Sequence, residues 1–314
     1  MNIVLTEPLT ISKEKLDSLK CELTNKGHSF ASFNQVAKSD EELKERIKDA
    51  DIIIIANSKL SGDVIRSTNN LKYISVAFTG VDHVDLEACK EKGIRVSNCS
   101  GYSTESVAEL AIGLMISFYR HINEGNEATK NGKDKKGLIG NTLNDKTVGV
   151  IGLGAIGEKV ARILTSFNCR VLGYNRHEKN IEGVKQVSLE ELLRESDIIS
   201  VHVPLNNETR HLLNESNLKL LKRNALVINT ARGPVIDYNC LADMLNNDLI
   251  QGACLDVYEK EPPLDINEKI LNAKNVITLP HVAYFTEEAM TKRSDLAFNN
   301  VEEFLKGNII NKIL

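Results

Sequence analysis

The stretch Val148-Gly149-Val150-Ile151-Gly152-Leu153-Gly154-Ala155-Ile156-Gly157 decides how the rest of the chain is interpreted. Its apolar start predicts a buried strand, and the pattern Gly-x-Gly-x-x-Gly follows that strand directly. The three glycines permit a tight turn, a close approach of a pyrophosphate, and close packing of a helix on the strand. Free backbone N–H groups at the start of that helix attract phosphates. The stretch therefore predicts a dinucleotide site with contacts from Gly152, Gly154, Ala155, Ile156 and Gly157.

Length and composition restrict the class of protein. The 314 residues are enough for about two domains, and the net charge of −4 gives no reason to expect nucleic-acid or membrane-surface binding. No apolar run reaches membrane-spanning length, and the first residues lack the pattern of a signal peptide. The six cysteines contain no Cys-x-x-Cys pair, so we expect reduced thiols, a cytoplasmic protein and no metal site.

The first hundred residues alternate between predicted strands and helices. Residues 51–56 are apolar on both faces, as a central parallel strand must be. Ser39 and Glu42 form a capping box before an apolar helical pattern. Strands are expected at residues 3–5, 30–33, 52–56, 73–78 and 94–98.

A second α/β series begins at the glycine-rich stretch. The helix after it has an inward apolar stripe of Val160, Ala161, Ile163, Leu164 and Phe167, and its strands are expected at 148–151, 171–174, 198–203, 226–229 and 252–255. A helix over 104–121 and a polar, glycine-rich stretch over 123–144 precede this series, and a last helix over 287–306 returns to the first domain.

We therefore expect an α/β protein with two doubly wound parallel sheets. Residues 1–101 and 285–314 would form a flavodoxin-like substrate domain. Residues 102–284 would form a Rossmann nucleotide-binding domain, with a dimerisation arm at about 120–146. In such folds ligands bind at strand carboxyl ends and at domain boundaries.

Three charged or titratable residues lie near predicted strand ends in the second domain. Arg232 follows the strand over 226–229, and an arginine there can clamp a carboxylate in a bidentate manner, although a surface ion pair is the simpler alternative. His281 is expected to end a further apolar strand, and Glu261 precedes that strand. A lone histidine is more often structural, but a histidine with a carboxylate partner makes a proton donor.

This combination resembles the D-isomer-specific 2-hydroxyacid dehydrogenase family over nearly the whole chain. The resemblance rests on seven motifs in the family's order, at residues 78–82, 102–109, 152–157, 202–205, 229–233, 255–262 and 280–281. It implies that His281 protonates the carbonyl oxygen of a 2-oxo acid while a reduced nicotinamide delivers hydride to C2. It also implies that Glu261 holds His281 in one tautomer and that Arg232 binds the substrate carboxylate.

The resemblance implies further contacts. Thr79 and Gly80 would hold the second carboxylate oxygen through their backbone, with Asn57, Tyr102 and Tyr284 around the substrate. Other cofactor contacts would come from Thr104, Val203, Pro204, Thr209, Thr230, Ala231 and Asp256. A homodimer is implied by the same resemblance.

The chain departs from the family pattern at the cofactor's ribose. NAD-preferring members have an aspartate after the second strand of the nucleotide domain, whereas this chain has Asn175 followed by Arg176. No carboxylate is present there to repel a 2′-phosphate, and Arg176 can pair with one. The sequence therefore favours NADP; NAD is the alternative, with Arg176 solvated.

Two segments bear on the substrate and point to different branches of the family. Tyr284 and the two residues after it resemble the D-lactate and branched-chain branch, whereas Asn57 and the two residues after it resemble the hydroxypyruvate and glycerate branch. The absence of an arginine near Asn57 argues against 3-phosphoglycerate, although a short phosphoglycerate dehydrogenase stays an alternative. So do a dehydrogenase of formate or phosphite and, from another class, a nucleotide-gated corepressor-like binding protein.

Overall fold

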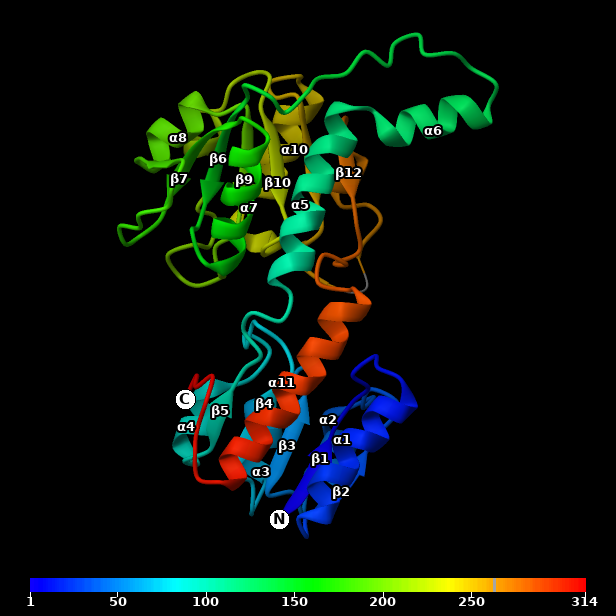
Figure 1. Cartoon of the computed structure of the whole chain (residues 1–314), viewed down its shortest axis with the longest axis vertical. Coiled ribbons are helices and arrows are strands. Elements are labelled where there is room, and N and C mark those ends of the chain that lie inside the picture. Colours follow the sequence, from blue (N-terminus) through cyan, green and yellow to red (C-terminus); the bar gives the residue numbers. More distant parts are fainter. Residues whose placement is uncertain (262–263) are drawn as a thin grey trace. The chain divides into compact units, whose positions relative to one another are not determined.

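The computed structural model describes residues 1–261 and 264–314, which divide into two units (Figure 1). Met1–Ser103 and Phe285–Leu314 form the first, which we call the split unit. Thr104–Tyr284 form the second, which we call the central unit. Each unit is built around one parallel sheet.

The split unit has a five-stranded sheet in the order β2-β1-β3-β4-β5. All four isoleucines of β3 are buried, as a central strand covered on both faces requires. The order reverses between β1 and β3, and α/β folds bind ligands at the carboxyl ends of such strands. The strands are β1 (Asn2–Leu5), β2 (Ser29–Ser32), β3 (Ile52–Ile55), β4 (Tyr73–Val76) and β5 (Arg95–Ser97).

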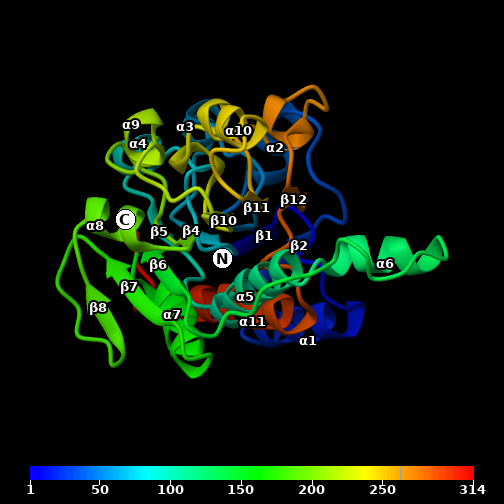
Figure 2. The ribbon, with the colours of Figure 1, turned by 90° about the horizontal axis from the view of Figure 1, so that it is seen from above.

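Helices cover both faces of this sheet, with α1 and α11 on one face and α2, α3 and α4 on the other (Figure 2). They are α1 (Lys13–Asn25), α2 (Asp40–Ile47), α3 (Gly62–Ser67), α4 (Leu86–Glu91) and α11 (Glu287–Leu305). Half of the expected capping box of α2 is present, since the Ser39 hydroxyl accepts a hydrogen bond from the Glu42 N–H. The Glu42 carboxylate accepts from the Lys38 N–H (2.9 Å) and not from that of Ser39. The α11 helix returns from the far end of the sequence, and the Phe304 ring stacks on Tyr73 with centroids 4.2 Å apart.

The central unit has a seven-stranded sheet in the order β12-β11-β10-β9-β6-β7-β8. The order reverses between β6 and β9, which places the glycine-rich turn after β6 at the switch point. The strands are β6 (Thr147–Ile151), β7 (Arg170–Tyr174), β8 (Val184–Gln186), β9 (Ile198–Val201), β10 (Leu226–Asn229), β11 (Gly252–Leu255) and β12 (Val276–Thr278).

Two apolar clusters pack on the two faces of this sheet. Helices α5 and α7 cover one face, and α8, α9 and α10 cover the other (Figure 2). The helices are α5 (Thr104–Tyr119), α6 (Ile122–Lys130), α7 (Ala155–Ser166), α8 (Leu189–Glu195), α9 (Glu215–Leu218) and α10 (Tyr238–Asn246), with short 3-10 turns at Gly233–Val235 and Lys269–Asn272.

The expected fold class is confirmed, and the differences are local. The helix expected to end at residue 121 ends at Tyr119, where His121 takes a φ of 50° and a new helix, α6, begins. This helix lies where the sequence suggested only a polar stretch, because it has no buried residue and hence no apolar pattern. Phe167, expected inside, caps α7 and is 41% exposed. Among the described residues, no helix is long and apolar enough to cross a bilayer.

Candidate functional site

The glycine-rich turn has the close contacts that its sequence predicts. Gly152 has a φ of 92°, and a Cβ on it would lie 2.7 Å from the carbonyl oxygen of His202. A Cβ on Gly157 would lie 1.9 Å from the Gly152 oxygen, so only glycine lets α7 pack this closely on the turn. A Cβ on Gly154 would meet nothing within 4 Å, so the turn is open beside Gly154.

The start of α7 offers unpaired donors at this open side. Gly154 is the N-cap residue and supplies no side chain to the helix end. The first-turn N–H groups of Ala155, Ile156 and Gly157 therefore have no partner within the helix. Together with the positive end of the helix dipole, they form a site suited to a phosphate.

The residues after β7 lie at the solvent-exposed edge of this turn. The Asn175 Oδ1 accepts a hydrogen bond from the Leu153 N–H (3.1 Å), and its Nδ2 donates to the His177 carbonyl (2.9 Å). Asn175 thus ties the glycine-rich turn to its own loop. Arg176 forms an ion pair with Glu208, and the two side chains are 61% and 69% exposed. Sequence reasoning did not find Glu208, which competes for the positive charge of Arg176.

The loop after β9 contains Val203, which is partly buried, and Pro204, which is exposed. The Thr209 hydroxyl donates to the Pro204 carbonyl and accepts from the Asn206 N–H (2.9 Å), so Thr209 closes this loop. His202 makes a 2.8 Å hydrogen bond with the Ser200 hydroxyl, and burial lowers the pKa of His202 to about 4. This histidine is therefore neutral near pH 7.

A hydrogen-bond network fixes the turn after β10. The buried Asn229 accepts from the Ala231 N–H (3.0 Å) and donates to the Arg232 carbonyl (3.0 Å) and to the Tyr238 hydroxyl (2.9 Å). Sequence reasoning missed Asn229 and Tyr238 as the supports of Arg232. The half-buried Arg232 donates from Nη1 to the Ala231 carbonyl at 2.8 Å. The Thr230 hydroxyl is buried and has no hydrogen-bond partner among the described residues.

His281 and Glu261 form a close pair in the same unit. The His281 Nδ1 contacts the Glu261 Oε2, while the Glu261 Oε1 accepts a 2.6 Å hydrogen bond from the Tyr258 N–H. The two side chains are 26% and 24% exposed. The Tyr284 ring stands edge-on to the imidazole, with centroids 5.3 Å apart. Pro262, part of the motif around Glu261, lies outside the described residues.

Asp256 connects the end of β11 to the segment after β12. Its side chain is fully buried, and its two oxygens accept 2.8 Å hydrogen bonds from the Val282 and Ala283 N–H groups. Burial raises the pKa of Asp256, and it outweighs the two hydrogen bonds, which act to lower that pKa. The carboxylate thus fixes the backbone directly after His281. Its expected contact with a nicotinamide stays a prediction.

The sheet order explains why these residues gather. β10, β11 and β12 are neighbours, and Arg232, Asp256 and His281 follow their carboxyl ends in that order. His281 comes three residues after β12 ends at Thr278, rather than at the end of the strand as expected. The central unit therefore brings an arginine, a histidine and a carboxylate partner together at the carboxyl ends of its strands.

The residues expected to bind substrate in the split unit also follow strand ends. Asn57 follows β3 and is exposed, and Thr79 and Gly80 follow β4. The Asn98 Nδ2, after β5, donates a 2.7 Å hydrogen bond to the Thr79 carbonyl. Tyr102 is buried with its ring centroid 6.1 Å from that of Phe78. Asn98 was not expected here, and it fixes the Thr79 backbone.

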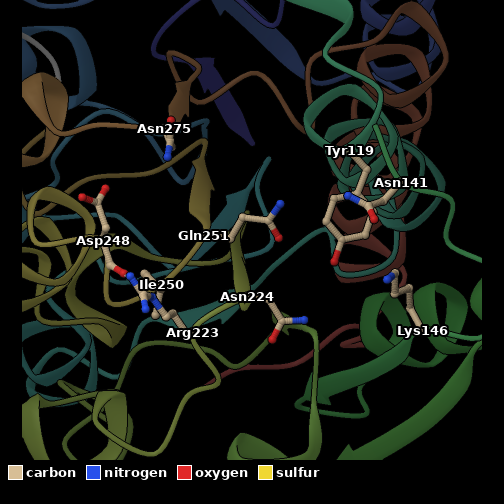
Figure 3. A pocket seen from close by; sticks show the side chains of 9 residues that line it. All are labelled: Tyr119, Asn141, Lys146, Arg223, Asn224, Asp248, Ile250, Gln251 and Asn275. Carbon is tan, nitrogen blue, oxygen red and sulfur yellow. The ribbon is translucent and has the colours of Figure 1, made fainter. Parts of the chain in front are cut away.

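A hollow of about 530 Å³ opens where the strands of the central sheet begin, at their amino ends (Figure 3). Lys146, Gln251 and Asn275 line it, and they directly precede β6, β11 and β12. Because ligands of parallel α/β sheets bind at the carboxyl ends of strands, this hollow is separate from the candidate site. Its remaining lining residues are Tyr119, Asn141, Arg223, Asn224, Asp248 and Ile250.

Comparison with known proteins gives consistent matches. Residues 112–283 match the family described as "D-isomer specific 2-hydroxyacid dehydrogenase, NAD binding domain". The chain is 39% identical over 281 residues to a D-3-phosphoglycerate dehydrogenase of Methanocaldococcus jannaschii, which covers 87% of this chain but only 53% of that protein. It is 40% identical over 256 residues to a hydroxypyruvate reductase of Thermotoga maritima, and the aligned region covers 80% of this chain and 84% of that protein.

A solved structure is similar along the full length of the chain. The acyclic imino acid reductase Bsp5, in complex with NADPH and D-Arg, has a TM-score of 0.91 and 32% sequence identity, with all of both chains covered.

Proposed function

This chain belongs to the D-isomer specific 2-hydroxyacid dehydrogenases, which are NAD(P)-dependent oxidoreductases, and from that premise we propose that it reduces hydroxypyruvate and glyoxylate to their 2-hydroxy acids. The observation that carries the proposal is the contact between His281 and Glu261 beside the turn of Arg232. This edge of the sheet offers a proton donor and an anion anchor together, as the reduction of a 2-oxo acid requires.

Three features of the central unit fit a nicotinamide dinucleotide. The open side of Gly154 lets a pyrophosphate approach the backbone. The uncapped first turn of α7 supplies N–H donors for phosphate, and the buried Thr230 hydroxyl has a hydrogen bond to offer. When bound and reduced, the nicotinamide supplies the hydride for C2 of the oxo acid.

The side chains supply the rest of the chemistry. Arg232 binds the substrate carboxylate with its planar guanidinium. Glu261 contacts the His281 Nδ1, and the Nε2 of the same ring is the atom that would donate the proton to the carbonyl oxygen. The Tyr258 N–H holds the other oxygen of Glu261, so the carboxylate is oriented from both sides. Asp256 keeps the backbone after His281 in place.

The choice of substrate rests on Asn57. A neutral amide at the carboxyl end of β3 suits a hydroxyl on C3 better than a phosphate, because phosphate favours arginine. The phosphoglycerate dehydrogenase of M. jannaschii keeps 3-phosphohydroxypyruvate as a second candidate. The names of the matched relatives give no support to a corepressor. Oxidation of NADPH or NADH should be followed with glyoxylate, hydroxypyruvate, pyruvate and 3-phosphohydroxypyruvate. A higher kcat/KM for the phosphorylated acid would reject this choice.

NADP is the proposed preferred cofactor, with NAD as the alternative. Arg176 lies at an exposed edge beside the glycine-rich turn, and its partner there is the single carboxylate of Glu208. An exposed ion pair contributes about 0–1 kcal/mol, so a 2′-phosphate can replace Glu208 at small cost.

We also propose that the split unit binds the substrate, that the central unit binds the cofactor, and that α6 and the segment after it form the arm of a homodimer. This arm extends away from the central sheet in both views (Figures 1 and 2). None of the residues of α6 is buried, and Ile139 is 92% exposed. Ile122 of α6 is also 51% exposed, and a dimer formed through this arm would cover both apolar side chains. Light scattering of Ile139→Asp against wild type tests this: a wild-type monomer would reject the dimer.

A cytoplasmic location fits the cysteines. All six are free, and burial raises the pKa of the Cys89 and Cys99 thiols to about 12. Such thiols are protonated and unreactive at neutral pH, which suits a reducing compartment. Fractionation of the source cells tests this, and recovery outside the cytoplasm would reject it.

A further inference from the structure

A buried carboxylate lies at the switch point of the split unit. Glu7 is the second residue after β1 and is 3% exposed. Its Oε1 accepts hydrogen bonds from the Ala56 N–H (2.8 Å) and the Ser58 N–H (3.1 Å), and its Oε2 accepts one from the Ser58 hydroxyl. All three donors belong to the turn after β3. Glu7 therefore connects the ends of the two strands between which the sheet order reverses.

Two arginines hold the chain on either side of Glu7. The Arg46 Nη1 donates to the Thr6 carbonyl at 2.8 Å, and the Arg293 Nη2 donates to the Leu9 carbonyl at 2.7 Å. Arg293 is 3% exposed. The two arginines therefore fix the backbone of the loop that carries Glu7.

Stability alone is a weak reason for this arrangement. Burying a charged side chain is unfavourable, and neutral side chains often serve a core equally well or better. The turn that Glu7 fixes carries Asn57, which is exposed and forms no hydrogen bond with any described residue. The amide is thus free for a ligand while the backbone on both sides of it is fixed.

We propose that Glu7 is a positioning residue for substrate selection: it fixes the turn so that the Asn57 amide binds the C3 hydroxyl of hydroxypyruvate. This inference rests on the proposed function. Glu7 does not touch the substrate, because its oxygens face the backbone and hydroxyl of the turn. It acts through Asn57, and therefore only on substrates that have a group on C3.

Glyoxylate and hydroxypyruvate separate this role from a purely structural one, because glyoxylate has no C3. Glu7→Ala leaves two N–H groups without their acceptor and frees the turn. One positioned hydrogen bond corresponds to about tenfold in affinity. We expect Glu7→Ala to raise KM for hydroxypyruvate about tenfold. The KM for glyoxylate, the kcat with either acid and the Kd of the cofactor should each change less than about twofold.

Conservative variants keep the test valid if Glu7→Ala does not fold. Glu7→Gln keeps one oxygen for the two N–H groups, and we expect it to restore most of the affinity for hydroxypyruvate. Ser58→Ala removes one of the three hydrogen bonds, and we expect a smaller rise in the same KM. Ser75→Ala is the matched control, since its buried hydroxyl donates to the Ala297 carbonyl at 2.9 Å within the same unit. It should alter thermal stability without altering the ratio of the two KM values.

A double-mutant cycle with Asn57→Ala completes the experiment. Because Glu7 acts through Asn57, Glu7→Ala should add less than about twofold to KM for hydroxypyruvate in the Asn57→Ala background. Equal changes for both acids, or additive effects of the two substitutions, would overturn the role of Glu7. If the wild type reduces neither acid, the proposed substrates are rejected. The proposed binding of a C3 hydroxyl by Asn57 is then rejected too.

Discussion

Removal of the carboxylate of Glu208 should increase the preference for NADPH. Arg176 and Glu208 form an ion pair in which both side chains are more than half exposed. A 2′-phosphate must displace Glu208 from the guanidinium before it gains that partner. In Glu208→Gln the guanidinium has no competing carboxylate, whereas wild type must break an exposed ion pair.

The magnitude follows from the two sets of contacts. Charge-assisted hydrogen bonds to a phosphate contribute about 1.5–3 kcal/mol, and loss of an exposed ion pair costs about 0–1 kcal/mol. The net gain is then about 0.5–3 kcal/mol, or roughly twofold to 150-fold in favour of NADPH. Glu208→Gln should raise the preference for NADPH over NADH by a further factor of about two to five. The upper limit is the roughly 1 kcal/mol that an exposed ion pair contributes. Because this edge is exposed, both ratios should fall as salt rises from 50 mM to 0.5 M, where the screening length shrinks to about 4 Å.

The matched reversal uses Asn175→Asp with Arg176→Ala. An aspartate retains the acceptor for the Leu153 N–H but loses the donor to the His177 carbonyl. That carbonyl still accepts from the Gln186 amide at 3.2 Å, so the loop should hold. The new carboxylate accepts hydrogen bonds from the ribose hydroxyls of NAD and repels a 2′-phosphate.

The assay is kcat/KM for NADPH and NADH at saturating oxo acid, measured at both salt concentrations for wild type and the variants. Thermal unfolding of each variant serves as the folding control. A wild type that prefers NADH by tenfold or more at low salt would refute the proposed role of Arg176, and the dehydrogenase assignment would stand.

Three further predictions concern single side chains. His281→Gln should lower kcat by roughly 10²–10⁴-fold with the Kd of the cofactor unchanged, and wild-type turnover in that variant would remove His281 from the mechanism. Arg232→Lys keeps the charge but loses the planar fork, so KM for the oxo acid should rise and kcat fall; a main loss in cofactor affinity by fluorescence titration would contradict this role. His202 has a pKa of about 4 in the folded chain against an ordinary 6.5, so its contribution to stability is complete above pH 6.5 and is lost as the pH falls towards 4. This contribution is about 3 kcal/mol, and His202→Gln should make the unfolding temperature less dependent on pH in that range; an unchanged dependence would count against it.

Local patterns in the sequence predicted the fold class and most of the strands because they depend on short-range chemistry. Runs such as the isoleucines of β3 identify buried strands, and the glycine spacing after β6 follows from close contacts that a Cβ would prevent. The helix α6 and the short edge strand β8 (Val184–Gln186) were missed for the opposite reason. Neither element has a fully buried residue, so neither leaves an apolar period in the sequence.

The supports of the candidate site could not be predicted in this way, because each one joins segments that are distant in sequence. Glu7 binds the turn of Ser58, and Asn98 binds the carbonyl of Thr79, through a sheet that brings parallel strands together. A capping serine has its partner three residues away, whereas these side chains find theirs only after the sheet has formed. Sequence motifs can thus suggest which residues meet the ligand, and the structure shows which residues hold them.

Asp256 shows how the two kinds of information combine. Its motif suggested a contact with the cofactor, and its geometry shows a carboxylate whose two oxygens hold the backbone after His281. Both roles place it at the same strand edge, between Arg232 after β10 and His281 after β12. Because burial raises the pKa of Asp256, a charged side chain is unfavourable here, but its hydrogen bonds fix the backbone beside His281. His281, the proposed general acid, is therefore held at its side chain by Glu261 and along its backbone by Asp256.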